Sequence, residues 1–257
     1  MNIIGNGVSV GGGGINVMVV RSIPATGAKE NMILLATNTN IGGVFVTYAP
    51  PSSPSNGDVW VCCDSSTGSK RISYESKGGK QVVDILPFFC WQYENDAWAP
   101  KEAQIYKNST WEYMAYCLAD ERVQSSLSDW TGYAYEANDM TASVSKPDVT
   151  LSDGNIYASF ASGTRGSVVF NSVISFANYN TAQFTCSTTR AVRHEFGCTE
   201  TLKNKYTWAA WQQLDTSGNH TFVVDVSSYS GDAYLLFGAW GSGGIQYVTA
   251  KQMILLP

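Results

Sequence analysis

The chain has 257 residues, of which 44% are hydrophobic, 12% aromatic and only 14% charged, and 24 are glycines. Soluble domains usually carry about 25% charged residues and helix surfaces draw on Glu, Lys and Ala, so this composition argues against helical bundles and coiled coils. The net charge of -5 and the pI near 5.0 argue against nucleic-acid binding, because phosphates demand a basic surface.

The N-terminal part carries two copies of one short pattern, Y-x-N-x-x-W. The first runs from Tyr93 to Trp98, and the second, from Tyr106 to Trp111, begins 13 residues later. Each copy predicts a β-hairpin with Asn in the turn and an aromatic residue on either arm. A looser repeat joins residues 25–35 to residues 51–61, both turn-rich and both running into an apolar strand. Repeated strand-turn units are typical of a modular structural protein.

Residues 114–124 form the one segment with helical spacing of apolar residues. The segment is short and is followed by a Ser-rich stretch, so we expect a connector over residues 113–129. This connector divides the chain into an N-terminal particle-attachment β region, residues 1–112, and a C-terminal domain, residues 130–257.

From Trp130 onward the chain alternates short apolar segments with turns. The expected strands cover residues 155–160, 166–170, 181–186, 207–211, 221–226, 234–240, 246–250 and 252–256. Within the first of these, alternation places Ile156, Ala158 and Phe160 on one face. Strands at this spacing predict an antiparallel sandwich. The expected fold class is therefore all-β, with a small hairpin-rich N-terminal anchoring region and a C-terminal antiparallel β-sandwich of jelly-roll type.

The C-terminal half resembles the carbohydrate-binding-module type of jelly roll. The resemblance rests on residues 222–256: a strand ending in D-V-S-S, a Gly turn, the segment Y-L-L-F-G-A-W, a Gly-rich turn and a terminal I-L-L. It covers about half of the chain. It implies a jelly-roll fold and a domain that binds sugars.

The N-terminal half resembles tail-associated structural proteins of phages and prophages of Firmicutes-type bacteria. The segments that carry it are G-G-G-G at 11–14, E-N-M-I at 30–33, P-S-N-G-D-V-W at 54–60 and A-Q-I-Y-K-N-S-T-W at 103–111. Leu34 stands where the pattern leads us to expect Trp, so that copy departs from it. The resemblance implies a virion component.

Aromatic residues of the strand at 234–240 are the candidate binding residues. If Leu235 and Phe237 face the interior of the sandwich, alternation places Tyr234 and Trp240 on the opposite face. Exposed aromatic rings stack against the C–H face of a sugar, so Trp240 and Tyr234 are the predicted glycan platform. Burial of the same rings in the core or in an oligomer interface is the alternative.

Catalytic chemistry has no sequence signature here. His194 and His220 are the only histidines, and no G-x-S-x-G or metal-ligand spacing accompanies them. A glycosidase needs two carboxylates, and nothing ranks one pair above another among Glu195, Glu200, Asp215 and Asp225. We therefore expect no catalytic residues, no metal and no cofactor.

The six cysteines also lack metal-ligand spacing. They are Cys62, Cys63, Cys90, Cys117, Cys186 and Cys198. We expect reduced thiols that serve as small apolar side chains. A disulfide between Cys186 and Cys198 stays open and would need an oxidising compartment.

Together these features predict a virion structural protein of a phage or phage-like particle, of tail-fibre or baseplate type, with a host-glycan-binding domain. The sequence shows no signal peptide and no apolar run of membrane-spanning length, so we expect assembly in the bacterial host cytoplasm. The expected partners are other virion proteins, further copies of the chain in a homotrimer, and host surface glycan. Two alternatives remain: a polysaccharide- or cell-wall-degrading enzyme with a carbohydrate-binding module, and a purely architectural tail, head-fibre or decoration protein.

Overall fold

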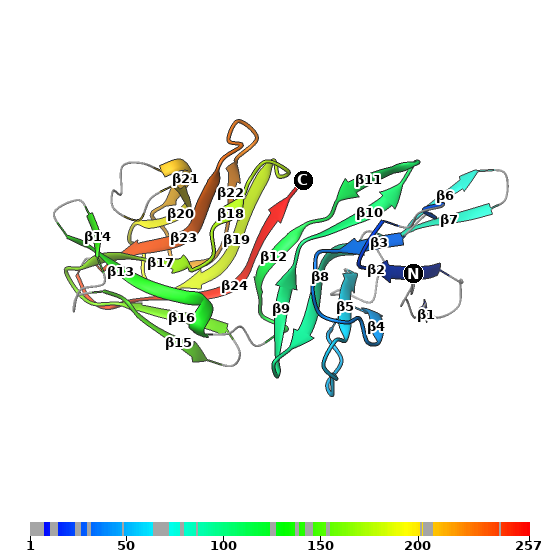
Figure 1. The fold of residues 1–257 in the computed structure, drawn as a ribbon. Coiled ribbons are helices and arrows are strands. Elements are labelled where there is room, and N and C mark those ends of the chain that lie inside the picture. Colours follow the sequence, from blue (N-terminus) through cyan, green and yellow to red (C-terminus); the bar gives the residue numbers. More distant parts are fainter. Residues whose placement is uncertain are drawn as a thin grey trace. The chain divides into compact units, whose positions relative to one another are not determined.

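The computed structural model of the chain (Figure 1) is all-β, as the composition predicts. It describes residues 8–10, 15–23, 27–29, 32–47, 49–63, 72–77, 80–85, 87–123, 127–136, 139–141, 146–152, 155–200, 202, 208–241 and 243–257. In these segments it has 24 strands and one short 3-10 helix, η1 (Leu127–Asp129). The chain divides into two compact units, Met1–Cys117 and Leu118–Pro257.

The N-terminal unit contains two main sheets and a separate hairpin. The first sheet has the order β1 (Val8–Val10), β2 (Ile15–Val20), β3 (Met32–Leu35), β10 (Ala103–Lys107), β11 (Thr110–Tyr113). The second has the order β4 (Val44–Thr47), β5 (Val59–Cys63), β8 (Pro87–Glu94), β9 (Ala97–Lys101). The hairpin is β6 (Ile72–Lys77) with β7 (Lys80–Ile85). The glycine run at 11–14 lies outside the described residues.

These two sheets share one internal arrangement. In each, a parallel pair, β2–β3 or β4–β5, is joined on one side by an antiparallel hairpin, β10–β11 or β8–β9. The repeats seen in the sequence therefore correspond to repeated structure. The parallel pairs were not expected, because the sequence indicated only antiparallel hairpins.

Both predicted hairpins are present. Their two turn residues have positive φ angles, 51° and 63° at Asn95 and Asp96, and 48° and 67° at Asn108 and Ser109, as a two-residue type I′ turn requires. The Tyr and Trp of each copy face each other across the strands, with ring centroids 5.4 Å apart in the first hairpin and 5.3 Å apart in the second.

The P-S-N-G-D-V-W segment has a structural role in this unit. The carboxylate of Asp58 accepts hydrogen bonds from the backbone N–H of Gly43 at 2.7 Å and of Ser55 at 2.8 Å. Gly57 has a φ of 94°, and a Cβ there would lie 2.5 Å from the carbonyl oxygen of Asn40. The motif therefore fastens the turn before β5 to the loop before β4.

The C-terminal unit is an antiparallel sandwich of two sheets. The sheet named here the β24 sheet has the order β15 (Asp148–Ser152), β16 (Asn155–Phe160), β24 (Gln246–Leu256), β19 (Thr181–Thr188), β22 (Gly218–Asp225). The β23 sheet has the order β14 (Asp139–Thr141), β13 (Trp130–Glu136), β17 (Arg165–Phe170), β23 (Asp232–Trp240), β20 (His194–Thr199), β21 (Trp208–Leu214). In addition, β18 (Ile174–Ser175) pairs with β23, and β12 (Tyr116–Asp120) with β24.

Aromatic rings fill the space between these sheets. Phe184 of the β24 sheet stacks on Phe237 and Phe196 of the β23 sheet, with ring centroids 4.7 and 5.2 Å away. Ile156 and Phe160, on the face predicted to be buried, are at most 1% exposed. The predicted sandwich and its core face are confirmed.

Two sequence expectations about strands were wrong. The connector expected over residues 113–129, which includes the segment with helical spacing, contains strand β12. The strands expected at 246–250 and 252–256 are one strand, β24. On the partner strand β19, Cys186 lies opposite Ala250 whereas Thr185 lies opposite Gln252, so Lys251 is an extra bulged residue.

Candidate functional site

The outer face of the β23 sheet carries both predicted platform residues. Phe237 is 1% exposed and faces the core, whereas Trp240 is 42% exposed on the opposite face, as alternation predicts. Tyr234 is half-buried and packs against an outer apolar cluster built on Val169 and Leu236. It lies six residues from Trp240 along one strand, a separation of about 20 Å. The structure therefore does not bring the two rings together.

Trp240 has charged neighbours from the adjacent strands. Arg165 of β17 lies opposite Trp240 in the sheet register, and its guanidinium carbon is 5.5 Å from the Trp240 ring centroid, within cation–π range. On the other side, the backbone N–H of Trp240 donates to the carbonyl of Arg193 at 3.0 Å. An exposed indole thus lies between two arginine positions.

Glu195 of β20 links these two arginines. Its side chain is 4% exposed, and one carboxylate oxygen, Oε1, pairs with Nη2 of Arg165 and, at 2.8 Å, with Nε of Arg193. A carboxylate this deeply buried needs such partners, because its desolvation costs several kcal/mol. The pairing in turn anchors the Arg165 guanidinium, which lies beside the Trp240 ring.

Gly238 keeps the neighbouring position free of a side chain. It lies between Ser167 on β17 and Glu195 on β20, and a Cβ there would lie 2.7 Å from the Ser167 hydroxyl oxygen.

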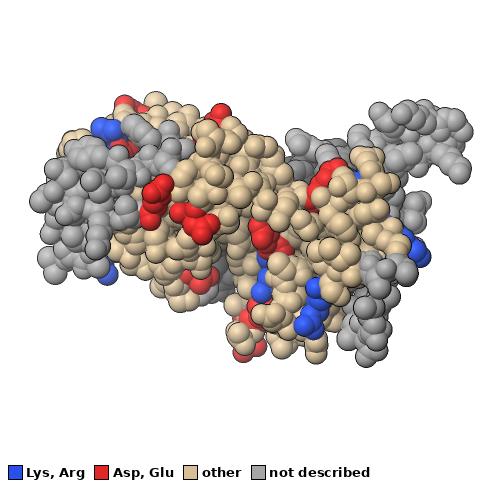
Figure 2. Space-filling view, turned by 45° about the horizontal axis from the view of Figure 1, so that its top comes forward, with Lys and Arg blue, Asp and Glu red and all other residues tan. Residues whose placement is uncertain are grey.

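Charged side chains on the face of the molecule drawn in Figure 2 form small separate groups with uncharged residues between them.

The candidate carboxylates occupy separate surroundings. Burial and the neighbouring Glu200 carboxylate raise the pKa of Tyr229 to about 12, and the Tyr229 hydroxyl donates to the carbonyl of Asp232 at 3.1 Å. Asp225 is exposed, and its pKa is lowered because it accepts hydrogen bonds from the hydroxyl and the backbone N–H of Ser227. Asp215 accepts a hydrogen bond from Gln213 at 3.0 Å.

The two histidines meet between the sheets. Their ring centroids are 6.0 Å apart; Nε2 of His194 lies 2.9 Å from Nε2 of Gln246, and Nε2 of His220 lies 3.0 Å from Oγ1 of Thr188. Burial and the neighbouring His220 lower the pKa of His194 to about 4. No sequence pattern marked this pair, because the two residues are far apart in the chain and β20 was not expected as a strand.

Five cysteines with described side chains are buried and form no disulfide with one another: Cys62, Cys90, Cys117, Cys186 and Cys198. The disulfide left open between Cys186 and Cys198 is absent, and burial raises the pKa of the Cys186 thiol to about 12. Among the described residues, no group of three or more His, Cys, Asp or Glu side chains could hold a metal ion. The described helical structure includes no segment long and apolar enough to cross a membrane.

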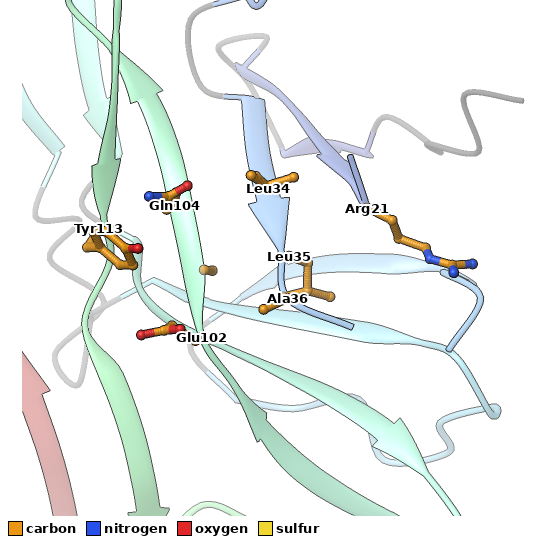
Figure 3. A pocket seen from close by; sticks show the side chains of 8 residues that line it. Arg21, Leu34, Leu35, Ala36, Glu102, Gln104 and Tyr113 are labelled. Carbon is orange, nitrogen blue, oxygen red and sulfur yellow. The ribbon is translucent and has the colours of Figure 1, made fainter. Parts of the chain in front are cut away.

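A small pocket of about 210 Å³ lies in the N-terminal unit, beside β3 and β10. Figure 3 shows Glu102 and Tyr113 on one side of it, Leu35 and Ala36 in the middle, and Arg21 on the far side with its side chain directed away. The Arg21 guanidinium donates to the side-chain oxygen of Asn40 at 2.8 Å. Ligand pockets usually measure about 300–1,000 Å³, so this one is small for a ligand site.

Comparison with known proteins gives structural matches only. No family model matches the chain, and no curated protein does. Among solved structures, a variant of CBM29-2, a family 29 carbohydrate-binding module, is similar with 11% identity and a TM-score of 0.38, over 55% of this chain and 91% of that chain. Another variant of it, complexed with cellulohexaose, has 10% identity and a TM-score of 0.38, over 55% of this chain and 89% of that one.

The low-affinity xylan-binding module CBM86 from Roseburia intestinalis is also similar. It has 12% identity and a TM-score of 0.33, over 49% of this chain and 93% of that chain. These neighbours are carbohydrate-binding modules. At TM-scores below 0.5 the similarity identifies no ligand for this chain, so its function has to be argued from its own residues.

Proposed function

We propose that the C-terminal unit binds glycan on the outer face of the β23 sheet, with Trp240 as the stacking residue. The observation that carries the proposal is the exposed Trp240 ring beside the Arg165 guanidinium, which is ion-paired to Glu195, a carboxylate that also pairs with Arg193. A sugar offers an apolar C–H face to an aromatic ring and hydroxyl groups to charged hydrogen-bonding partners. Because the ion pairs already hold the arginines, less side-chain entropy is lost on binding.

Within this proposal the two predicted platform residues have unequal roles. Trp240 provides the exposed ring. Tyr234 packs in the apolar cluster about 20 Å away along the same strand, and we assign it a peripheral position on the face. Arg165 and Glu195, which no sequence pattern marked as binding residues, take its place beside Trp240.

For the whole chain we propose a structural protein of a phage or phage-like particle, of tail-fibre or baseplate type. The support is the sequence resemblance of the N-terminal half, together with the repeated parallel-pair-and-hairpin sheets of that unit. In this proposal the N-terminal unit attaches to other virion proteins, the chain forms a homotrimer assembled in the host cytoplasm, and the C-terminal unit holds host glycan without cleaving it.

Titration of the purified chain with cell-wall polysaccharide from Firmicutes tests the binding site. Trp240→Ala should weaken binding by about 5- to 150-fold, equivalent to about 1–3 kcal/mol, and leave the melting temperature nearly unchanged. Val223→Ala removes a similarly exposed apolar side chain from the other sheet and should bind as the wild type does. Equal binding by the wild type and Trp240→Ala would refute the site, and release of new reducing ends would favour the enzyme alternative.

A further inference from the structure

Two tyrosines lie side by side on the outer face of the β24 sheet, the sheet opposite the one that carries Trp240. The ring centroids of Tyr157 and Tyr247 are 5.4 Å apart and their planes differ by 23°. Tyr157 is on β16 and Tyr247 on β24, in diagonal register, because Thr249 lies opposite Tyr157. Both rings are half-buried and point outward, since their strand neighbours Ala158 and Val248 are buried in the core.

Hydroxyl and amide side chains continue from this pair across the whole sheet. One row of directly paired residues crosses β15, β16, β24, β19 and β22: Thr150, Tyr157, Thr249, Ser187 and Asn219. None of the five is buried. At about 4.8 Å between neighbouring strands, the row is about 19 Å long. We call this surface, the row together with Tyr247, the tyrosine face.

The tyrosine face contains no charged residue. The only Asp, Glu, Lys or Arg residues in these five strands are Asp148 on the edge strand β15, Lys251 at the bulge of β24 and Asp225 at the end of β22. Solvent-facing sheet surfaces usually carry charged residues. Desolvation and the neighbouring Tyr247 raise the pKa of Tyr157, so the Tyr157 phenol stays a neutral hydrogen-bonding group. A partner suited to this face is itself uncharged and rich in hydroxyl groups.

A protein partner fits the tyrosine face less well. The buried centres of protein interfaces are enriched in Tyr, Trp, Phe, Met and Arg and depleted in Ser; in the row only the tyrosine pair matches this composition, and Thr, Ser and Asn surround it. Large aliphatic side chains are missing from the row. We propose that the tyrosine face is a second glycan-binding surface, which takes a neutral polysaccharide strand with its sugar rings on Tyr157 and Tyr247 and its hydroxyls along the row. It does not depend on the Trp240 site.

Affinity gel electrophoresis of the full chain tests this proposal, with hydroxyethyl cellulose, galactomannan and dextran as neutral probes and alginate as the polyanionic control. The wild type should be retarded by at least one neutral probe and not by alginate. Tyr157→Ala and Tyr247→Ala should each weaken that binding on the order of tenfold. Tyr157→Phe should retain most of it because the ring remains, and Trp240→Ala should bind the neutral probe as the wild type does.

Ser187→Lys places a charge in the middle of the row without removing packed side chains, and should abolish binding in a chain that melts normally. Several results would overturn the proposal: no retardation of the wild type by any neutral probe, or unchanged binding in Tyr247→Ala and Ser187→Lys. A drop in oligomeric mass in these variants, with sugar binding intact, would instead identify the face as an interface between copies. Loss of binding in Trp240→Ala alone would support only the site on the other sheet.

Discussion

Truncation of Phe237 tests the assignment of the two faces of β23. Phe237 is 1% exposed, and its ring centroid lies 4.7 Å from that of Phe184 and 6.3 Å from that of Trp130. Truncating a buried Phe to Ala costs about 3–5 kcal/mol of stability. With two other rings in contact, we expect Phe237→Ala to cost the middle of that range, about 4 kcal/mol, which is a large share of the 5–15 kcal/mol that stabilises a typical domain.

Urea unfolding followed by tryptophan fluorescence measures this loss as a lower midpoint at unchanged slope. For a unit of this size the melting temperature should fall by about 10–15 °C. Trp240→Ala is the matched comparison on the same strand and should cost less than about 1 kcal/mol, because the Trp240 ring is 42% exposed. A tolerated Phe237→Ala together with an unfolded Trp240→Ala would mean that the two faces of the strand are reversed.

Two further predictions concern the ends of the sandwich. The pKa of His194 in the folded chain, about 4, lies below its usual value of 6.5, so the unfolded chain binds more protons than the folded chain between these two pH values. The melting temperature should therefore fall as the pH drops from about 6.5 to 4. His194→Gln should flatten this profile; the neighbouring ionisable groups are His220 and Asp215. A fragment starting at Tyr116 should melt at a higher temperature than one starting at Trp130, because only the longer fragment keeps the pairing of β12 with β24; equal melting would show that β12 adds no stability.

Local chemistry made part of this fold predictable from the sequence. The two hairpins follow from Asn in a two-residue turn, where positive φ is required, and from the Tyr and Trp that this turn places opposite each other. The buried face of β16 follows from alternation, because one side of that strand meets the core and the other does not. Such features depend on a few adjacent residues, so a short stretch of sequence contains them.

Other strands gave no such signal. Every residue of β20 (His194–Thr199) is buried, so the strand shows no alternation and was not expected. Lys251 interrupts the period of two in β24, so that Ala250 and Met253 both face the core although they are three residues apart. A bulge of this kind is decided by pairing with the neighbouring strand, which lies far away in the chain.

The sequence by itself determined that Trp240 and Phe237 face opposite sides of one strand, because side-chain direction in a strand alternates residue by residue. Only the tertiary structure decided what surrounds each of them. Strand pairing places Arg165 from β17 and Glu195 from β20 beside Trp240, and the outer apolar cluster takes in Tyr234. The same pairing brings Tyr157 next to Tyr247. These contacts join residues tens of positions apart, and their energies depend on burial and register that no local pattern encodes.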